Sequence, residues 1–308
     1  MAMTLSDPPV PADWARHTPA SDPGPWAALL DAVAPRPAEI GRVVRNLGAH
    51  YRGQEADLPP ATRGDVDLRW VADMLATDQR RHDVRPLGAE RPVGERLQGC
   101  CRDHSLLAVA ILRHHGVPAR CRVGFADYFV PGWHADHVVV EWHDGTRWRR
   151  FDPEVDPAWG LLPDPLDLDV EVLENGEPGF VTAGETFRLV QEGRLDPSSH
   201  GVAPGIPELA GEGFVLAELL WELAHRYGDE LLLWDSWGGV PGPGEAMDPA
   251  LLDVLDRAAA LLAAADVGSG QAEAELHALY VSDARLHPGA EVVRHSPVTD
   301  DAVTVRLR

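Results

Sequence analysis

Two adjacent cysteines, a histidine and an aspartate are the residues of this chain that could together perform nucleophilic catalysis. Cys100 and Cys101 follow Gly99 and precede a segment whose apolar residues recur at three- and four-residue spacing. That spacing predicts a helix that begins at the cysteines and ends before Gly116. The N–H groups and the dipole at a helix N-terminus favour an anion, and the thiolate is the reactive form of cysteine.

Asp103 opposes this chemistry, because a carboxylate in the same helical turn repels a thiolate. Some other group must therefore supply positive charge beside the sulfur. The backbone and Arg102 are the partners open to the Asp103 carboxylate. Either partner would turn the carboxylate away from the sulfur.

A predicted hairpin carries His137, the residue that could supply the missing positive charge. Asp144-Gly145 lies between two short apolar runs, which is a strong signal for a two-residue hairpin loop. That register places His137 opposite Asp152, with Cβ atoms about 5 Å apart. It also pairs Val138 with Phe151 on the other face, toward a core.

A carboxylate beside an imidazole fixes the tautomer and favours the imidazolium. The imidazolium would hold a cysteine thiolate and later protonate a leaving amine. The residues therefore name Cys101 or Cys100 as nucleophile, His137 as base and Asp152 as the group that orients it.

The elements around these residues predict an α+β protein, with helices at both ends of a small antiparallel sheet. Residues up to about 20 form an irregular arm, residues 54–63 and 82–97 are connecting segments, and residues 159–178 form an acidic, proline-rich surface segment. The pattern predicts helices at 25–33, 37–51, 65–81, 183–191, 214–233 and 249–265, and strands at 119–129, 137–142, 147–151 and within 290–308.

Composition excludes several functions. The chain of 308 residues carries 27 basic and 49 acidic side chains, a net charge of −22, which argues against nucleic acid and anionic membranes as partners. The sequence contains no lysine, so Schiff-base chemistry is excluded. The N-terminus has no signal peptide and no apolar run would span a membrane, so we expect a cytoplasmic protein with reduced cysteines.

Three ordered motifs closely resemble those of the transglutaminase-like superfamily. They are Gly99-Cys-Cys-Arg-Asp103, which runs on to Gly-Val-Pro-Ala-Arg120, then His137-Val-Val-Val-Glu141, and finally Trp148-Arg-Arg-Phe-Asp-Pro153. The resemblance covers residues 68–157. It implies a bacterial protein with a papain-like core, in which a cysteine helix packs on the sheet that carries the histidine and aspartate.

The resemblance selects among the candidates. It places the catalytic cysteine two residues before Asp103, hence Cys101, with His137 and Asp152 completing a triad. Family members often have an aromatic residue after the histidine, where this chain has Val138. His134 offers a competing alignment, but it lacks the glutamate four residues on.

Other residues receive weaker roles. Gln98 and Cys100 are candidates for substrate binding, although Gln98 lies closer to the cysteine than the glutamine of papain-like enzymes does. Gln98 is also a candidate for donating a hydrogen bond to the oxyanion, and the backbone N–H of Cys101 is the better placed donor. His134, Asp136 and His137 do not converge on one face of a strand, so we expect no metal, and no cofactor is implied.

These observations define the expected enzyme. Residues 1–64 form an N-terminal arm and helices, 65–158 the catalytic core and 159–308 a mainly helical region that shapes the pocket. The core would act on an amide or thioester through an acyl-enzyme on Cys101, which water or an amine resolves. We expect a small-molecule, peptide or carrier-bound substrate, and the sequence leaves the oligomeric state open. The alternative is a non-catalytic domain of this family that binds a partner.

Overall fold

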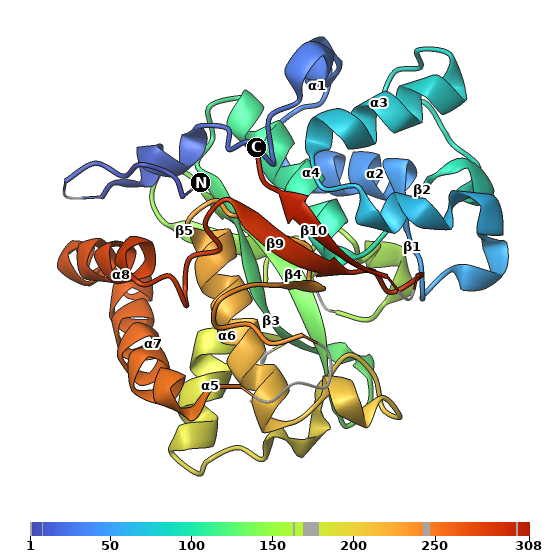
Figure 1. The fold of residues 1–308 in the computed structure, drawn as a ribbon. Helices are drawn as coiled ribbons and strands as arrows, with labels where there is room; N and C mark the ends of the chain where they lie inside the picture. Colours follow the sequence, from blue (N-terminus) through green and yellow to red (C-terminus); the bar gives the residue numbers. More distant parts are fainter. Residues whose placement is uncertain (1, 8, 163, 169–178, 243–246, 300) are drawn as a thin grey trace.

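A curved sheet of five strands forms the centre of the molecule (Figure 1). The computed structural model describes residues 2–7, 9–162, 164–168, 179–242, 247–299 and 301–308. The strands are β3 (Ala119–Val130), β4 (Trp133–His143), β5 (Trp148–Phe151), β6 (Phe180–Thr182) and β7 (His200–Gly201). Their order is β5-β4-β3-β6, and β7 pairs with β4 in parallel while the other pairs are antiparallel. This arrangement confirms the predicted α+β class.

The cysteine helix, α4 (Cys101–His114), packs against β4 and β3. All but its last residue are buried, because the helix is covered by the sheet and by the N-terminal helices. Ser105 Oγ donates to the Val138 carbonyl oxygen at 2.7 Å, which ties the second turn of α4 to the strand that carries His137. This hydrogen bond therefore fixes the position of the helix N-terminus relative to the residues of β4.

The β4–β5 hairpin has a different register from the predicted one. Val140, not Val138, pairs with Phe151, and His143 pairs with Trp148, so the loop contains four residues instead of two. The Asp144 carboxylate accepts hydrogen bonds from the backbone N–H groups of Thr146 at 2.8 Å and Arg147 at 3.0 Å, which stabilises the longer turn. The register shifts by two residues, and a shift of two leaves each side chain on its predicted face.

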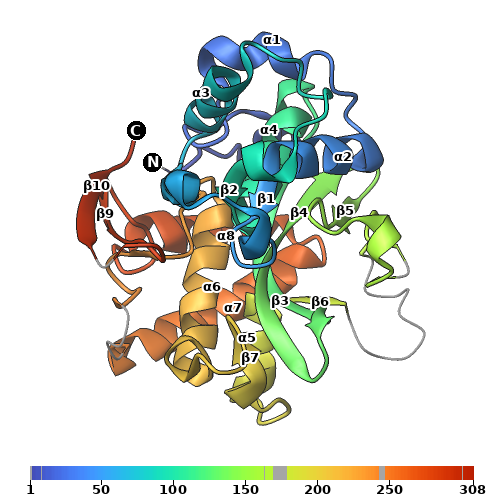
Figure 2. The same cartoon turned by 90° about the vertical axis from the view of Figure 1, so that its right-hand side faces the viewer.

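The N-terminal helices cover α4 at the top of Figures 1 and 2. They are α1 (Ala27–Leu30), α2 (Pro37–Leu47) and α3 (Val71–His82). The helix predicted at 37–51 ends at Leu47, because β1 (Gly48–His50) pairs in parallel with β2 (Leu97–Gly99) immediately before the cysteines. The helix predicted at 65–81 begins at Val71, after a 3₁₀ segment.

The described residues of the C-terminal region include four α-helices and a small sheet. The helices are α5 (Ala183–Gln191), α6 (Glu212–Arg226), α7 (Leu252–Asp266) and α8 (Gly270–Ser282), and the sheet comprises β8 (Asp235–Ser236), β9 (Glu291–His295) and β10 (Ala302–Arg306). Figure 2 shows α6 between the β9–β10 hairpin and β3. The bounds of α5 match the prediction, α8 was not predicted, and parts of the predicted segment 159–178 lie outside the described residues.

A buried network of charged residues joins the central sheet to α6 and α7. Arg122 of β3 donates to Glu141 of β4 at 2.8 Å, to Glu222 of α6 at 2.6 Å and to Asp266 of α7 at 2.8 Å. The Arg122 side chain is fully buried. Its positive charge is paired with three carboxylates, which offsets the desolvation cost of burying it.

Among the described residues, no helix has the length and apolar character that a membrane span requires.

Replacing the central cation of this network should destabilise the fold. We expect Arg122→Met to lower the free energy of unfolding by about 3–5 kcal/mol, because buried Glu222 loses its arginine partner while Glu141 and Asp266 each lose one of theirs. Arg188→Met is the control, since Arg188 forms an exposed pair with Glu192 and should cost less than about 1 kcal/mol. Urea denaturation measures both. Equal losses would show that the network does not stabilise the fold.

Candidate active site

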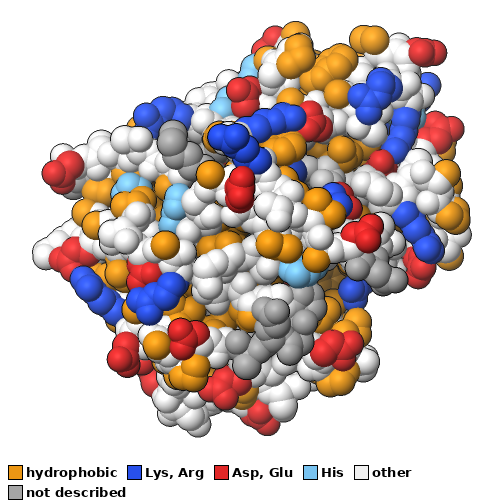
Figure 3. All heavy atoms as spheres, viewed as in Figure 1, with side chains coloured by type: hydrophobic (Ala, Val, Ile, Leu, Met, Phe, Trp, Pro, Cys, Tyr) orange, Lys and Arg blue, Asp and Glu red, His pale blue; other side chains and the backbone are white. Residues whose placement is uncertain are grey.

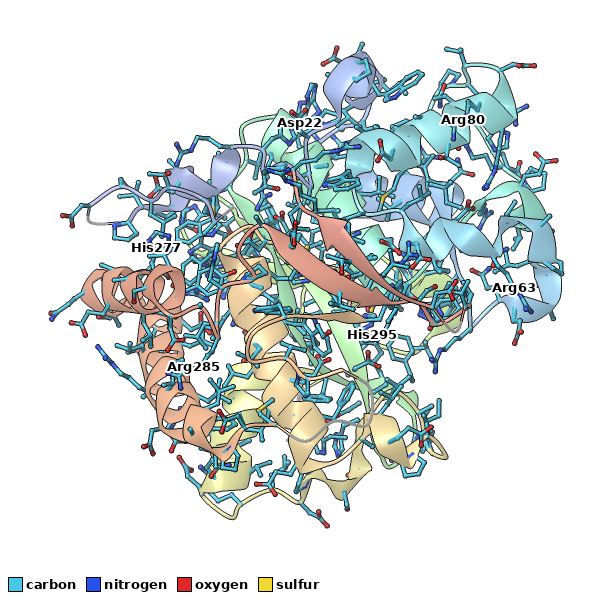
Figure 4. All side chains as sticks on the ribbon, in the orientation of Figure 1. Asp22, Arg63, Arg80, His277, Arg285 and His295 are labelled. Atoms are coloured by element: carbon cyan, nitrogen blue, oxygen red, sulfur yellow. The ribbon has the colours of Figure 1, made fainter. Side chains whose placement is uncertain are left out.

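One large cavity, of about 2010 Å³, holds the predicted nucleophile and base together. Cys100 and Cys101 reach it from the start of α4 and His137 from β4. Residues of α6 and of the C-terminal hairpin form other parts of its wall, and one of them is His295 of β9, labelled in Figure 4. The N-terminal, central and C-terminal segments therefore all contribute to the site.

The start of α4 is fixed by Asp103 and Arg102. Asp103 Oδ2 accepts a hydrogen bond from the Cys100 backbone N–H at 2.9 Å, and Asp103 Oδ1 accepts one from Arg102 at 2.9 Å. Both expected partners of the carboxylate are confirmed. Arg102 is fully buried and also donates to the carbonyl oxygens of Arg69 at 2.8 Å and Leu231 at 3.1 Å.

His137 and Asp152 form a buried pair despite the shifted register. His137 Nε2 lies 2.8 Å from Asp152 Oδ2. The contact survives because Asp152 follows the last residue of β5 and its side chain can reach diagonally along β4. Asp152 Oδ1 accepts from the backbone N–H of Glu154 at 2.8 Å, so both oxygens are occupied.

Tyr128 is a partner of this pair that the sequence analysis did not identify. Its hydroxyl donates to the same Asp152 oxygen at 2.7 Å, and its ring lies edge-on to His137 with 6.0 Å between centroids. Phe129 packs edge-on against His137 from the next position, at 4.9 Å. The pairing of β3 with β4 is irregular between Ala126 and Val130, so no register count from the sequence could place Tyr128 beside Asp152.

The carboxylates at the site raise the pKa of both the base and the nucleophile. Burial alone would lower the pKa of His137, but the Asp152 carboxylate outweighs it and raises that pKa above the ordinary value. The pKa of the Cys101 thiol is raised well above its usual value by its hydrogen bond with Cys100, by burial, and by the nearby Glu154 and Asp136 carboxylates.

The raised pKa of the Cys101 thiol disfavours the thiolate expected from the sequence. Asp152 favours the imidazolium as expected, but Glu154 and Asp136, which also line the cavity, offset its effect on Cys101. The thiol must lose its proton as the reaction proceeds. His137 can accept that proton only when the imidazole is neutral, which requires a pH near or above its raised pKa.

Gln98 and Cys100 occupy different surroundings. The Gln98 amide nitrogen donates to the Pro59 carbonyl oxygen at 2.7 Å and to Thr62 Oγ1 at 2.8 Å, so its N–H groups are used within the fold. Gln98 is also absent from the lining of the large cavity, whereas Cys100 is part of it. Substrate contact is therefore open to Cys100 and not to the Gln98 amide N–H groups.

The competing histidine lies elsewhere. His134 contacts Asp127 and stacks on His200 of β7, with 4.0 Å between ring centroids. It does not line the large cavity, in which His137 stands beside the cysteines. Within the described ranges, no group of three or more His, Cys, Asp or Glu side chains is arranged to hold a metal ion.

Figure 3 shows acidic and basic side chains interspersed over the face viewed, with hydrophobic side chains between them.

Comparison with known proteins identifies the core. The family model of the transglutaminase-like superfamily matches residues 68–153. A crystal structure described as that of a "putative cysteine protease" from Cytophaga hutchinsonii is 20% identical over 38% of this chain and 43% of that chain, with a TM-score of 0.18. The chain thus spans less than half the length of that protein. No match was found among curated proteins.

The pKa of His137 should depend on the Asp152 charge. We expect it to lie above the ordinary histidine value in the unmodified protein and to fall in Asp152→Asn, because burial is then opposed only by the smaller contributions of Glu154 and Asp136. NMR titration of the imidazole measures both. Asp156→Asn, at another cavity-lining carboxylate, should leave the pKa of His137 unchanged. An unchanged value in Asp152→Asn would refute the electrostatic role of Asp152.

Proposed function

We propose that this protein is a cysteine enzyme that acts on an amide or thioester, because residues 68–153 match the family model of the transglutaminase-like superfamily. One observation supports the proposal above the others. Cys101 and His137 line a single cavity, and a buried carboxylate, Asp152, holds the imidazole at 2.8 Å. Nucleophile, base and orienting acid are the components of acyl transfer by a cysteine.

The tautomer of His137 assigns its two nitrogens. Nε2 donates to the Asp152 carboxylate, so the neutral imidazole has its acceptor lone pair on Nδ1. Nδ1 takes the Cys101 proton as the sulfur attacks the carbonyl carbon and the carbonyl π electrons move to oxygen. The Cys101 backbone N–H, at the start of α4, is the donor nearest in the chain to that oxyanion.

The second half of the reaction reverses the proton path. The tetrahedral intermediate collapses, the C–N or C–S bond breaks, and the leaving amine or thiol takes the proton from His137 Nδ1. An acyl thioester remains on Cys101. Water or an amine then attacks its carbonyl, gives a proton to the same nitrogen, and restores the Cys101 thiol. Water makes the protein an amidase or peptidase, and an amine makes it an acyltransferase.

The cavity volume supports a sizeable substrate. At about 2010 Å³ it exceeds the roughly 300–1,000 Å³ that encloses a drug-sized ligand. Its wall includes Phe214 and Trp221 of α6, so the helices that follow the family domain take part in substrate binding. A peptide or a carrier-bound acyl group would occupy such a space more fully than a small amide.

The two cysteines provide a matched test of the nucleophile. With 4-nitrophenyl acetate, we expect a burst of about one nitrophenolate per chain, because acylation of a thiol precedes slower hydrolysis. Cys101→Ala should abolish the burst, while Cys100→Ala, in the same cavity, should retain it. His137→Ala should slow the burst by about 10²-fold or more. Stopped-flow absorbance measures each. A burst that persists in Cys101→Ala would contradict the proposal.

A further inference from the structure

Two carboxylates beside Cys101 have no arginine partner. Asp136 directly precedes His137 on β4, and Glu154 follows Asp152 by two residues. Both line the large cavity. In the described part of the chain, neither forms an ion pair with an arginine, although arginine pairs hold most other buried carboxylates here.

Glu154 is nearly buried and incompletely satisfied. It is 8% exposed, and its Oε2 atom has no hydrogen-bond partner among the described residues. The nearest imidazole nitrogen, His104 Nδ1, lies at 3.6 Å and already donates to the Cys100 carbonyl oxygen at 3.0 Å. Burial lowers the pKa of His50, another neighbour, so that side chain offers no compensating charge at neutral pH. Glu154 thus faces the cavity as an acceptor without a donor.

Helix α6 provides a second, independent polar group without a partner in the cavity wall. Trp221 of α6 lines the cavity, is 7% exposed, and has no acceptor for its indole N–H among the described residues. Glu218 lies three residues earlier on the same helix face, is fully buried, and has two carboxyl oxygens without partners. The Asp136 charge contributes to the raised pKa of Glu218, so this carboxyl lies within electrostatic reach of the cavity wall.

The remaining lining favours a cation. Eight carboxylates and four arginines line the cavity. Of the arginines, Arg42 is paired with Glu39, Arg45 with Asp156, and Arg96 donates to a backbone carbonyl oxygen. The fourth, Arg52, donates to the Tyr51 hydroxyl at 2.7 Å, lies over the Tyr51 ring, and its charge acts on Asp136. The rings of Tyr51 and Phe129 also line the cavity. Carboxylates with aromatic faces are the surroundings that bind ammonium and guanidinium groups.

We propose that Asp136 and Glu154 form a subsite that binds a cationic group, an alkylammonium or guanidinium, of the substrate whose carbonyl Cys101 attacks. This inference rests on the proposed function and specifies its substrate class. The cation is a recognition group and not the attacking amine, because these carboxylates hold an amine in its protonated form, which has no lone pair for attack. The unpartnered Trp221 N–H is placed to donate to an oxygen of the same substrate.

Charged thiol reagents test the subsite without turnover. In a Cys100→Ser background, we would compare the reaction of Cys101 with methyl methanethiosulfonate, which is neutral, and with its 2-(trimethylammonium)ethyl analogue. Each forms a mixed disulfide and releases methanesulfinate. The ratio of the two rates cancels differences in the amount of thiolate between variants. We expect the ratio of the rate with the cationic reagent to the rate with the neutral reagent to exceed that of free cysteine by about tenfold. A cleft lined with negative charges concentrates their field and attracts the cation.

Matched variants locate the effect. Glu154→Gln and Asp136→Asn should each lower the rate ratio several-fold, whereas Glu212→Gln, at an exposed carboxylate that also lines the cavity, should leave it unchanged. N-acetyl-argininamide should slow labelling by the neutral reagent, and its uncharged analogue N-acetyl-citrullinamide should not. Glu154→Gln should remove this protection.

Two results would overturn the subsite. One is a rate ratio equal to that of free cysteine or unchanged in both variants, and the other is equal protection by the arginine and citrulline compounds. Failure of the proposed function is a separate outcome. A rate ratio above that of free cysteine, with protection by the arginine compound but no nitrophenolate burst from Cys101, would retain the cation subsite and reject the acyl-enzyme.

Discussion

The buried Asp152 carboxylate is the contact on which the site depends. It is fully buried at the end of β5, where an unpaired anion would be costly. Its partners come from three places in the chain: the His137 imidazole of β4, the Tyr128 hydroxyl of β3 and the backbone N–H of Glu154. Satisfying one anion therefore fixes the orientation of the proposed base and the ends of three consecutive strands.

A second buried ion plays the same part for the nucleophile. Arg102 joins the Asp103 carboxylate to the carbonyl oxygens of Arg69 and Leu231, so the start of α4 is fixed to segments before and after the family domain. The Arg122 network then joins the sheet to α6 and α7. The geometry of Cys101 and His137 thus rests on contacts outside residues 68–153, and the C-terminal helices both position the site and line its cavity.

The sequence predicts the parts of this arrangement that depend on local pattern. Apolar spacing places α4 and α5, and the Asp144-Gly145 signal places the hairpin that carries His137 and Asp152. The predicted loop is two residues shorter than the observed one. The Asp144 carboxylate accepts hydrogen bonds from the backbone N–H groups of Thr146 and Arg147, which stabilises the longer turn. The paired residues remain on one face only because the shift is even.

Other features depend on tertiary contacts and have no local signal. Tyr128 reaches Asp152 across an irregular stretch of β3, and Glu154 is noticeable only once Cys101 and His137 are known to share its cavity. Helix α8 buries Ala272, Leu276 and Tyr280 at four-residue spacing, together with Glu273, which binds Arg226. The raised pKa of Cys101 likewise arises from its hydrogen bond with Cys100, from burial, and from Glu154 and Asp136, none of which a spacing rule supplies.

The central claim is that Cys101 carries the acyl group of a substrate. Intact-mass spectrometry after incubation with cell extract or candidate amides, with an acid quench, tests it most directly. The account predicts one acyl adduct on the peptide that contains Cys101, removed by neutral hydroxylamine as a thioester would be, and no adduct in Cys101→Ala. An adduct on Cys100 alone, or an unmodified chain while substrate is consumed, would contradict it.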